Sequence, residues 1–135
     1  ALAALKARFG KHVAPSPIVV VGYAEGAEVA ADLARQEPSF FARVALVNGN
    51  PAAFTSTAAK TFAERGGKRV LFFCTNAACQ DSATERGLML SRGGVATKTA
   101  QTAVGPYLDQ AFVDALAKEV PWLIEGDARF GKPRH

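Results

Sequence analysis

Apolar and polar positions follow two alternating patterns along this chain. Short runs rich in Val, Leu and Phe recur at intervals too long for β-hairpins, and each interval holds a segment with helical spacing of its apolar residues. Buried strands separated by helices are typical of a parallel sheet with crossover connections. We predict strands near 18–23, 43–48, 69–74 and 95–99, and helices near 25–36, 57–65, 80–91 and 108–119. The pattern therefore predicts an α/β fold with a parallel sheet of about four strands.

Length and composition favour one domain. At 135 residues the chain is long enough to bury an ordinary core but short for a complete α/β enzyme. Hydrophobic residues make up 49% and charged residues 21%, which is a globular composition. We expect a single domain over 1–135, with a leading helix and linker at 1–14. Residues 126–135 lose the periodicity, so we expect a tail along the surface there.

The charge distribution argues against nucleic acid as a partner. The formal net charge is +4, but the 16 Lys and Arg residues are scattered along the chain rather than gathered. Basic residues interleaved with aromatic ones, which single-stranded nucleic acid would require, are missing. The longest apolar runs, such as 18–21, are far too short to cross a bilayer. We therefore expect a soluble chain that binds neither nucleic acid nor membrane.

The most specific motif in the chain joins the first predicted strand to the helix that follows. In Gly22-Tyr23-Ala24-Glu25-Gly26, a glycine stands two residues on either side of Ala24. This is the pattern of a nucleophile elbow, Gly-x-Ser-x-Gly, in which a strained turn lifts a serine above the sheet. An alanine methyl group has no lone pair and no removable proton, so residue 24 cannot attack a carbonyl. The motif thus favours a hydrolase scaffold and argues against hydrolase chemistry.

On this motif and the order of its elements, the chain resembles the C-terminal half of the α/β-hydrolase superfamily, in particular serine hydrolases of the esterase or peptidase type. The segments 22–27, 43–49, 69–74 and 121–123 look like parts of the fifth to eighth strands and the final helix of that family. The resemblance covers most of the chain. It leaves out the N-terminal half of the family fold, which supplies the earlier strands and one oxyanion-hole donor.

The resemblance implies where the other members of a catalytic triad would stand. The acid would follow the strand at 69–74, where the chain offers Asn76 and no carboxylate, and the histidine would fall at Pro106. An amide can orient an imidazole but cannot stabilise an imidazolium as an anion does, and proline has no side-chain base. The two histidines of the chain are His12 and His135, neither near the expected site.

Because all three positions are substituted, we predict a domain without a usable triad that serves in binding or assembly. The alternative is a modified or partial chain of a serine hydrolase that requires residues absent here. We predict no cofactor. The glycine-flanked turn could cradle a phosphate, but it matches neither a dinucleotide fingerprint nor a phosphate loop, and Glu25 would repel an anion at the helix start.

Cys74 and Cys79 leave two alternatives open. They could be unlinked thiols packed in the core, or a disulfide that closes the loop between a strand and a helix. A disulfide would suit a secreted or periplasmic protein, whereas free thiols would suit the cytoplasm. Two sulfurs without a neighbouring His or further Cys do not make a metal site, and a nucleophilic Cys74 would lack a base.

Two apolar regions could contact partners. The resemblance implies that the strand at 18–21 has lost the neighbour that an N-terminal half would supply, so its edge would be open. We expect a homo-oligomer that pairs these edges across a two-fold axis, or a separate chain carrying the other half. The aromatic residues Phe40, Phe41 and Phe54 fall in predicted loops, where exposed rings would mark a partner surface.

Overall fold

The computed structural model describes residues 19–49, 52, 54–102 and 109–126 of the chain. Within them lies one four-stranded sheet of β1 (Val19–Tyr23), β2 (Arg43–Val47), β3 (Arg69–Cys74) and β4 (Ala96–Gln101). All neighbouring strands run parallel, in the order β1-β2-β3-β4. The predicted α/β fold and its parallel sheet are confirmed.

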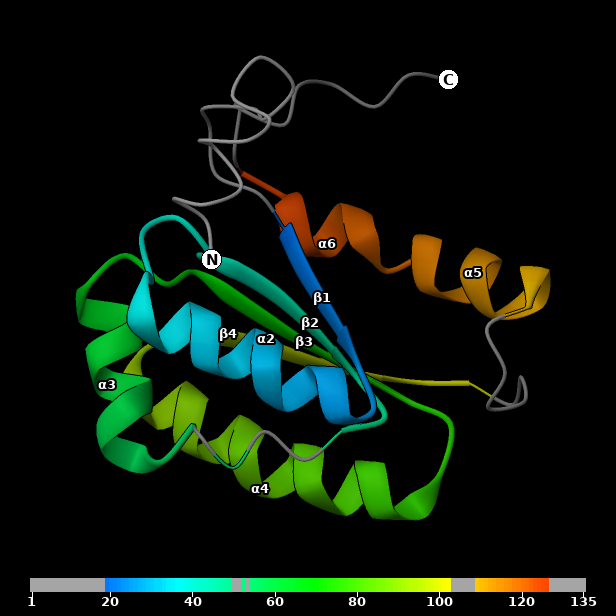
Figure 1. Ribbon diagram of the computed structural model, residues 1–135, viewed down its shortest axis with the longest axis horizontal. Helices are drawn as coiled ribbons and strands as arrows, with labels where there is room; N and C mark the ends of the chain where they lie inside the picture. The colour runs from blue at the N-terminus through cyan, green and yellow to red at the C-terminus, as the bar shows by residue number, and fades with distance from the viewer. Residues whose placement is uncertain (1–18, 50–51, 53, 103–108, 127–135) are drawn as a thin grey trace.

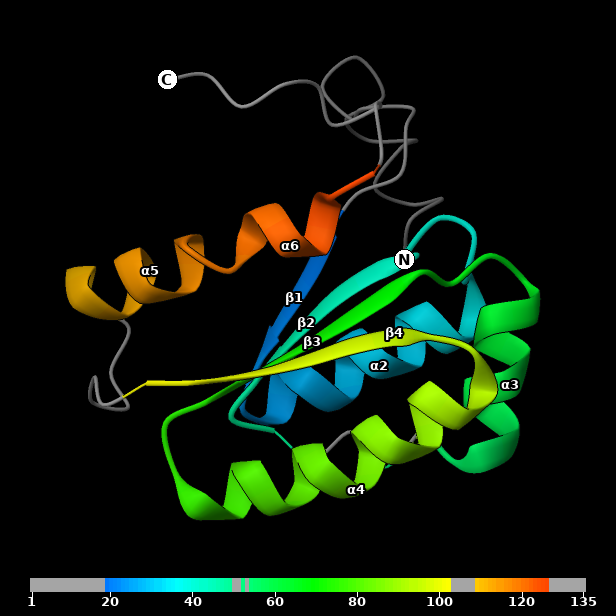
Figure 2. The same cartoon turned by 180° about the vertical axis from the view of Figure 1, so that it is seen from behind.

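Helices cover both faces of the sheet (Figures 1 and 2). The three crossover helices, α2 (Glu25–Gln36), α3 (Ser56–Glu64) and α4 (Ala77–Gly93), lie on one face. On the other face lie α5 (Gln110–Ala117) and α6 (Val120–Ile124), which follow β4 in the chain. The helix predicted at 108–119 corresponds to α5, and α6 lies beyond it, around the segment 121–123 that the resemblance implied to belong to a final helix. The sequence predicted α4 from residue 80, but the helix begins at Ala77 because Asn76 caps it.

Small side chains let α2 lie close to the sheet. Four of its residues form a buried stripe: Ala27, Ala30, Ala31 and Ala34. The central strands β2 and β3 are buried on both faces, which accounts for their nearly continuous apolar sequences. The prediction that Phe41 and Phe54 mark an exposed partner surface is wrong. Phe41 is 5% exposed and Phe54 is fully buried against Phe62, and Phe40 packs partly buried against the same core, because these loops fold back onto it.

Two arginines attach α6 to the amino ends of the central strands. Arg43 and Arg69 are register partners at the amino ends of β2 and β3. The Nη1 of Arg43 donates to the carbonyl of Leu123 at 2.6 Å, and the Nη1 of Arg69 donates to that of Trp122, also at 2.6 Å. The Arg69 guanidinium also lies 4.9 Å from the ring centre of Trp122. The two guanidinium groups thus donate to carbonyls in the last turn of α6, of which that of Trp122 also accepts from the N–H of Glu125 at 3.4 Å.

The two outer strands of the described sheet differ in character. β1 reads Val-Val-Val-Gly-Tyr, and the side chain of Val21 is 52% exposed. β4 carries Thr and Lys residues, and its Lys98 forms an ion pair with Glu119 at 2.7 Å. Of the two edges, that of β1 is the more apolar one.

Several predictions fall on parts of the chain outside the described residues. These are the leading helix and linker at 1–14, the tail beyond Gly126, Ile18 at the start of the predicted first strand, and Pro106. Among the helices that are described, none has the length and apolar character needed to cross a membrane.

Candidate functional site

Ala24 connects β1 to α2 at the carboxyl end of the strand, in a backbone conformation that residues with a Cβ rarely adopt. Its φ is 53° and its ψ is −117°. Such a conformation costs on the order of 1–3 kcal/mol and persists where surrounding contacts impose it. Here the Ala24 N–H donates to the carbonyl of Val47 at 2.8 Å, and the Ala24 carbonyl accepts from the N–H of Ala27 at 3.0 Å. The turn is therefore held between the neighbouring strand and the first turn of the helix.

Two glycines allow this turn to form. A Cβ on Gly22 would overlap the carbonyl oxygen of Gly26 and lie 2.7 Å from the Cα of Ala27. A Cβ on Gly49 would overlap the Cβ of Ala27 and lie 2.7 Å from the carbonyl oxygen of Ala24. By contrast, a Cβ on Gly26 would meet nothing within 4 Å. Of the two glycines that flank Ala24 in the sequence motif, only Gly22 is required by close packing.

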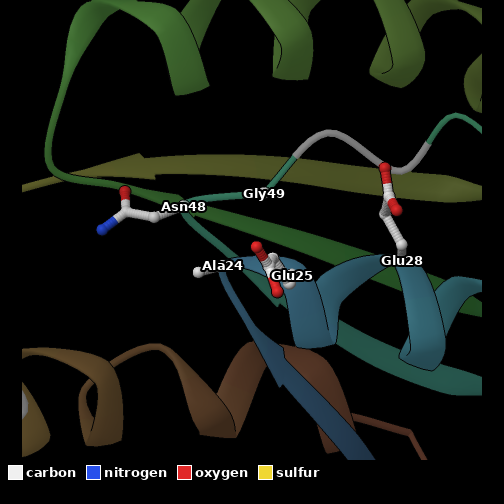
Figure 3. Close-up of a pocket in the computed structure, with 5 residues that line it drawn as sticks. All are labelled: Ala24, Glu25, Glu28, Asn48 and Gly49. Carbon is white, nitrogen blue, oxygen red and sulfur yellow. The ribbon is translucent and has the colours of Figure 1, made fainter.

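A cavity of about 550 Å³ lies over the turn. We call it the elbow cavity, and the residues that line it are Ala24, Glu25, Glu28, Asn48 and Gly49. Figure 3 shows Ala24 between Asn48, at the end of β2, and Glu25, with Glu28 one turn further along α2. The carboxylates of Glu25 and Glu28 lie in the first turn of α2, where the helix dipole favours negative charge.

Asn48 ties the end of β2 to the end of β3. Its Nδ2 donates to the Oγ1 of Thr75 at 2.8 Å, and its Oδ1 accepts from the N–H of Thr75 at 2.9 Å. Its own N–H donates to the carbonyl of Phe73 at 3.0 Å. Like Ala24, Asn48 has a positive φ, of 49°, which asparagine tolerates better than most residues.

A second cavity, of about 240 Å³, lies on the far side of Asn48. We call it the disulfide cavity, and it is lined by Asn48, Gly49, Asn76, Ala78, Cys79 and Ser82. Asn48 and Gly49 line both cavities. The two residues after β2 therefore form a shared wall between them.

Asn76, at the position where the resemblance implies the catalytic acid, has a structural role. Its Oδ1 accepts from the N–H of Cys79 at 2.8 Å, and its backbone is extended, with φ −146° and ψ 164°. This is the geometry of a helix N-cap. The side-chain oxygen that would orient an imidazole is thus occupied by the start of α4. Asp81, the nearest carboxylate in sequence, lies within α4 and is exposed.

Cys74 and Cys79 form a disulfide, with their Cα atoms 5.5 Å apart. This decides between the two alternatives that the sequence left open. Cys74 is fully buried and Cys79 is 6% exposed, so the bond lies in the core under the first turn of α4. Disulfide sulfurs are neither nucleophiles nor metal ligands. Within the described part of the chain, no group of three or more His, Cys, Asp or Glu could hold a metal ion.

The structure brings together most of the residues that the motif predicted. Gly22, Tyr23, Ala24, Glu25 and Gly26 form one strand-turn-helix unit. Pro106, His12 and His135 lie outside the described residues.

The sequence reasoning missed Asn48, Gly49 and Glu28 as parts of the site. A signal for the first two was present, because an Asn-Gly pair directly after a buried strand is typical of a turn with positive φ. Glu28 lies one helical turn after Glu25, a spacing that places both side chains on one face.

No protein-family model, no curated protein and no solved structure matches this chain.

Proposed function

We propose that this chain is an α/β-hydrolase-like domain without a usable catalytic triad, with a role in binding or assembly. The observation that carries the proposal is the backbone of Ala24, with φ 53° and ψ −117° at the carboxyl end of β1. A nucleophile elbow holds its serine on such a strained strand-to-helix turn. In this chain the strained turn is present and the hydroxyl is missing, so residue 24 supplies no nucleophile.

The surroundings of the turn also support a non-catalytic role. The side-chain oxygen of Asn76 is engaged by the helix that it caps, at 2.8 Å from the N–H of Cys79. A triad acts as a unit, and loss of a single member removes most of its effect. No proton relay can form through this site. Ala24 and Asn76 stand at two of the triad positions, and by sequence Pro106 stands at the third.

A ligand of the elbow cavity is expected to be neutral or cationic. Glu25 and Glu28 are the charged groups that line it, and both side chains are exposed at its rim. Two carboxylates repel an anion, and they outweigh the attraction of the helix dipole, which amounts to about half a charge. This excludes the phosphate ligands that a glycine-rich turn could otherwise suggest.

A fluorophosphonate probe and a generic ester test the loss of catalysis. We expect neither labelling nor turnover by the natural chain, and none by Ala24→Ser, because a serine without a base is a poor nucleophile. Ala24→Gly is the matched control, since it accepts the same backbone without adding a hydroxyl. Labelling or ester turnover by the natural chain would refute the proposal.

The second candidate is a modified or partial chain of a serine hydrolase. What favours it is the position of β1, which pairs with β2 alone among the described strands and leaves its other side open to a further strand. Full probe labelling of Ala24→Ser, with none in Ala24→Gly, would favour this candidate. Absence of labelling in Ala24→Ser would favour the non-catalytic domain.

Assembly is proposed through the edge of β1. The partner would be a second copy, paired edge to edge across a two-fold axis, or a chain that supplies the missing half. The 52% exposure of Val21 and the 61% exposure of Val29 on the adjoining α2 support an apolar contact here. Light scattering at micromolar concentration should give an oligomer. Val21→Lys should dissociate it, whereas Thr99→Lys, on the polar edge at β4, should not. A monodisperse natural monomer would count against self-assembly.

The Cys74–Cys79 disulfide supports a proposal about the compartment. Structural disulfides persist in oxidising environments, so we propose that the protein functions outside the cytoplasm, in a secreted or periplasmic setting. Alkylation of protein taken directly from its source cells, followed by mass analysis, tests this. Two alkylated thiols would contradict the proposal.

A further inference from the structure

The disulfide and the elbow cavity are joined by a short series of contacts. Cys74 ends β3, and the next residue, Thr75, exchanges two hydrogen bonds with the side chain of Asn48, at 2.8 and 2.9 Å. Asn48 and Gly49 then form the wall that the elbow cavity shares with the disulfide cavity.

We infer that the Cys74–Cys79 disulfide sets the shape of the elbow cavity, by fixing Thr75 and through it Asn48. The disulfide closes a turn that contains only residues 75–78 between its two cysteines. Both ends of that turn are anchored, because Cys74 belongs to a buried central strand and Cys79 to the first turn of α4. Thr75 is therefore held at a fixed place beside the end of β2.

The backbone of Asn48 makes this coupling sensitive. Asparagine tolerates positive φ better than most residues, but other backbone conformations are open to it, so its contacts decide which one it keeps. For Asn48, with φ 49°, these contacts are the two bonds to Thr75 and the bond from its N–H to the carbonyl of Phe73. Loosening Thr75 removes two of the three contacts. Asn48 is then free to leave the positive φ region, which moves the wall of both cavities.

Reduction is the step that would loosen Thr75. A dithiol gives two electrons and two protons to the disulfide, the S–S bond breaks, Cys74 and Cys79 become thiols, and the dithiol becomes its own disulfide. Two thiol sulfurs need more room than a disulfide, and in the reduced form the start of α4 would be held by the Asn76 cap. Because Cys74 and Cys79 are 0% and 6% exposed, attack on their sulfurs requires the first turn of α4 to open. This coupling does not depend on what the cavity binds.

The test compares amide spectra and hydrogen exchange of the oxidised chain and the dithiothreitol-reduced chain. We expect reduction to shift the amide signals of Asn48, Gly49 and Glu25, besides those of 74–79. Exchange of the Asn48 N–H should accelerate roughly fivefold or more, the effect of losing about one net hydrogen bond. The amide signals of Arg43 and Arg69, at the amino ends of their strands, and of Leu123, which Arg43 contacts, should not shift.

Asn48→Gly is the uncoupling variant, because glycine accepts the positive φ but lacks the amide that bonds Thr75. In this variant, reduction should shift 74–79 and leave Gly49 and Glu25 unmoved. If the buried bond resists the reductant, the double variant Cys74→Ala, Cys79→Ala replaces the reduced state. Unmoved Asn48 and Gly49 signals in the reduced natural chain would overturn the inference. The inference would also be overturned if reduction still shifted the signals of Gly49 and Glu25 in Asn48→Gly. Global unfolding on reduction would overturn it too, since the disulfide would then stabilise the whole fold.

Discussion

The turn after β1 and the turn after β3 both lead from the carboxyl edge of the sheet into a helix, and they are stabilised in opposite ways. Ala24 has a strained backbone, with φ 53°, and α2 begins without a side-chain cap. Asn76 has a relaxed, extended backbone, a side-chain cap at 2.8 Å, and a disulfide across its turn. The first turn is imposed by the sheet and helix packed around it, whereas the second is held by its own bonds.

Under the proposed function, the first turn is kept for a site and the second for stability. Strain that local contacts do not repay is commonest at functional positions. The backbone of Ala24 is strained in the way that functional residues often are, but its methyl side chain has no group that could react. Four predictions sharpen the comparison, and each is measured by urea denaturation.

The largest effect is expected where the first turn depends on close packing. Gly22→Ala should lower the free energy of unfolding by about 3 kcal/mol, because the new methyl group would meet backbone atoms of Gly26 and Ala27 that cannot move aside. The matched control is Gly26→Ala, whose Cβ meets nothing within 4 Å and which lies in a helix. The control should be neutral or slightly stabilising. Equal losses in the two variants would contradict the packing account.

The next largest loss of stability is expected from removing the disulfide that closes the second turn. The double variant Cys74→Ala, Cys79→Ala should lose about 2 kcal/mol of stability, the chain-entropy value for so short a loop. Adding dithiothreitol to the natural chain should lower its midpoint in the same direction and leave that of the double variant unchanged. A natural chain that is insensitive to reductant even after complete reduction would show that the cap alone holds this turn.

The cap itself is expected to contribute less. Asn76→Ala should cost about 1 kcal/mol, because the N–H of Cys79 loses its acceptor. Asn76→Asp keeps an acceptor at the same place and adds a charge that the helix dipole favours, so it should match the natural chain or exceed it. A loss in Asn76→Asp as large as that in Asn76→Ala would contradict the capping role.

The smallest effect is expected at the strained residue, and it has the opposite sign. Ala24→Gly should raise the free energy of unfolding by roughly 0.5–1 kcal/mol, since relief of strain exceeds the entropy that glycine loses on folding. Ala24→Ser should be close to neutral, because serine keeps a Cβ in the same conformation. A destabilised Ala24→Gly would mean that the turn carries no strain.

The sequence predicted best where a single local pattern decides the structure. The bounds of α2 and β3 agree with the prediction, because an apolar strand and a helix with a small-residue stripe have clear periodicities. The strain at Ala24 was also expected from its place between glycines. The periodicity did not predict α6 as a helix of its own, since α6 is set by packing on the sheet and by contacts with Arg43 and Arg69, which lie far away in sequence.

The site was only half predictable for the same reason. Residues 22–26 form a local motif, and the sequence found them. Asn48 acts through Thr75, which lies 27 residues away, and that pairing depends on the register of β2 with β3. The disulfide could not be chosen over free thiols from spacing alone, because the choice depends on where α4 begins.

The hydrogen bonds from Arg43 and Arg69 to α6 determine how the C-terminal region tolerates substitution and truncation. The acceptors nearest to both guanidinium groups are backbone carbonyls, at Leu123 and Trp122, and any amino acid other than those that break the helix presents the same oxygen. Point substitutions that spare the buried Leu123 should therefore leave the attachment intact. A stop before residue 122 would remove both acceptors and take the buried Leu123 out of its cluster with Leu71, so shortening this end is far more hazardous than altering its composition.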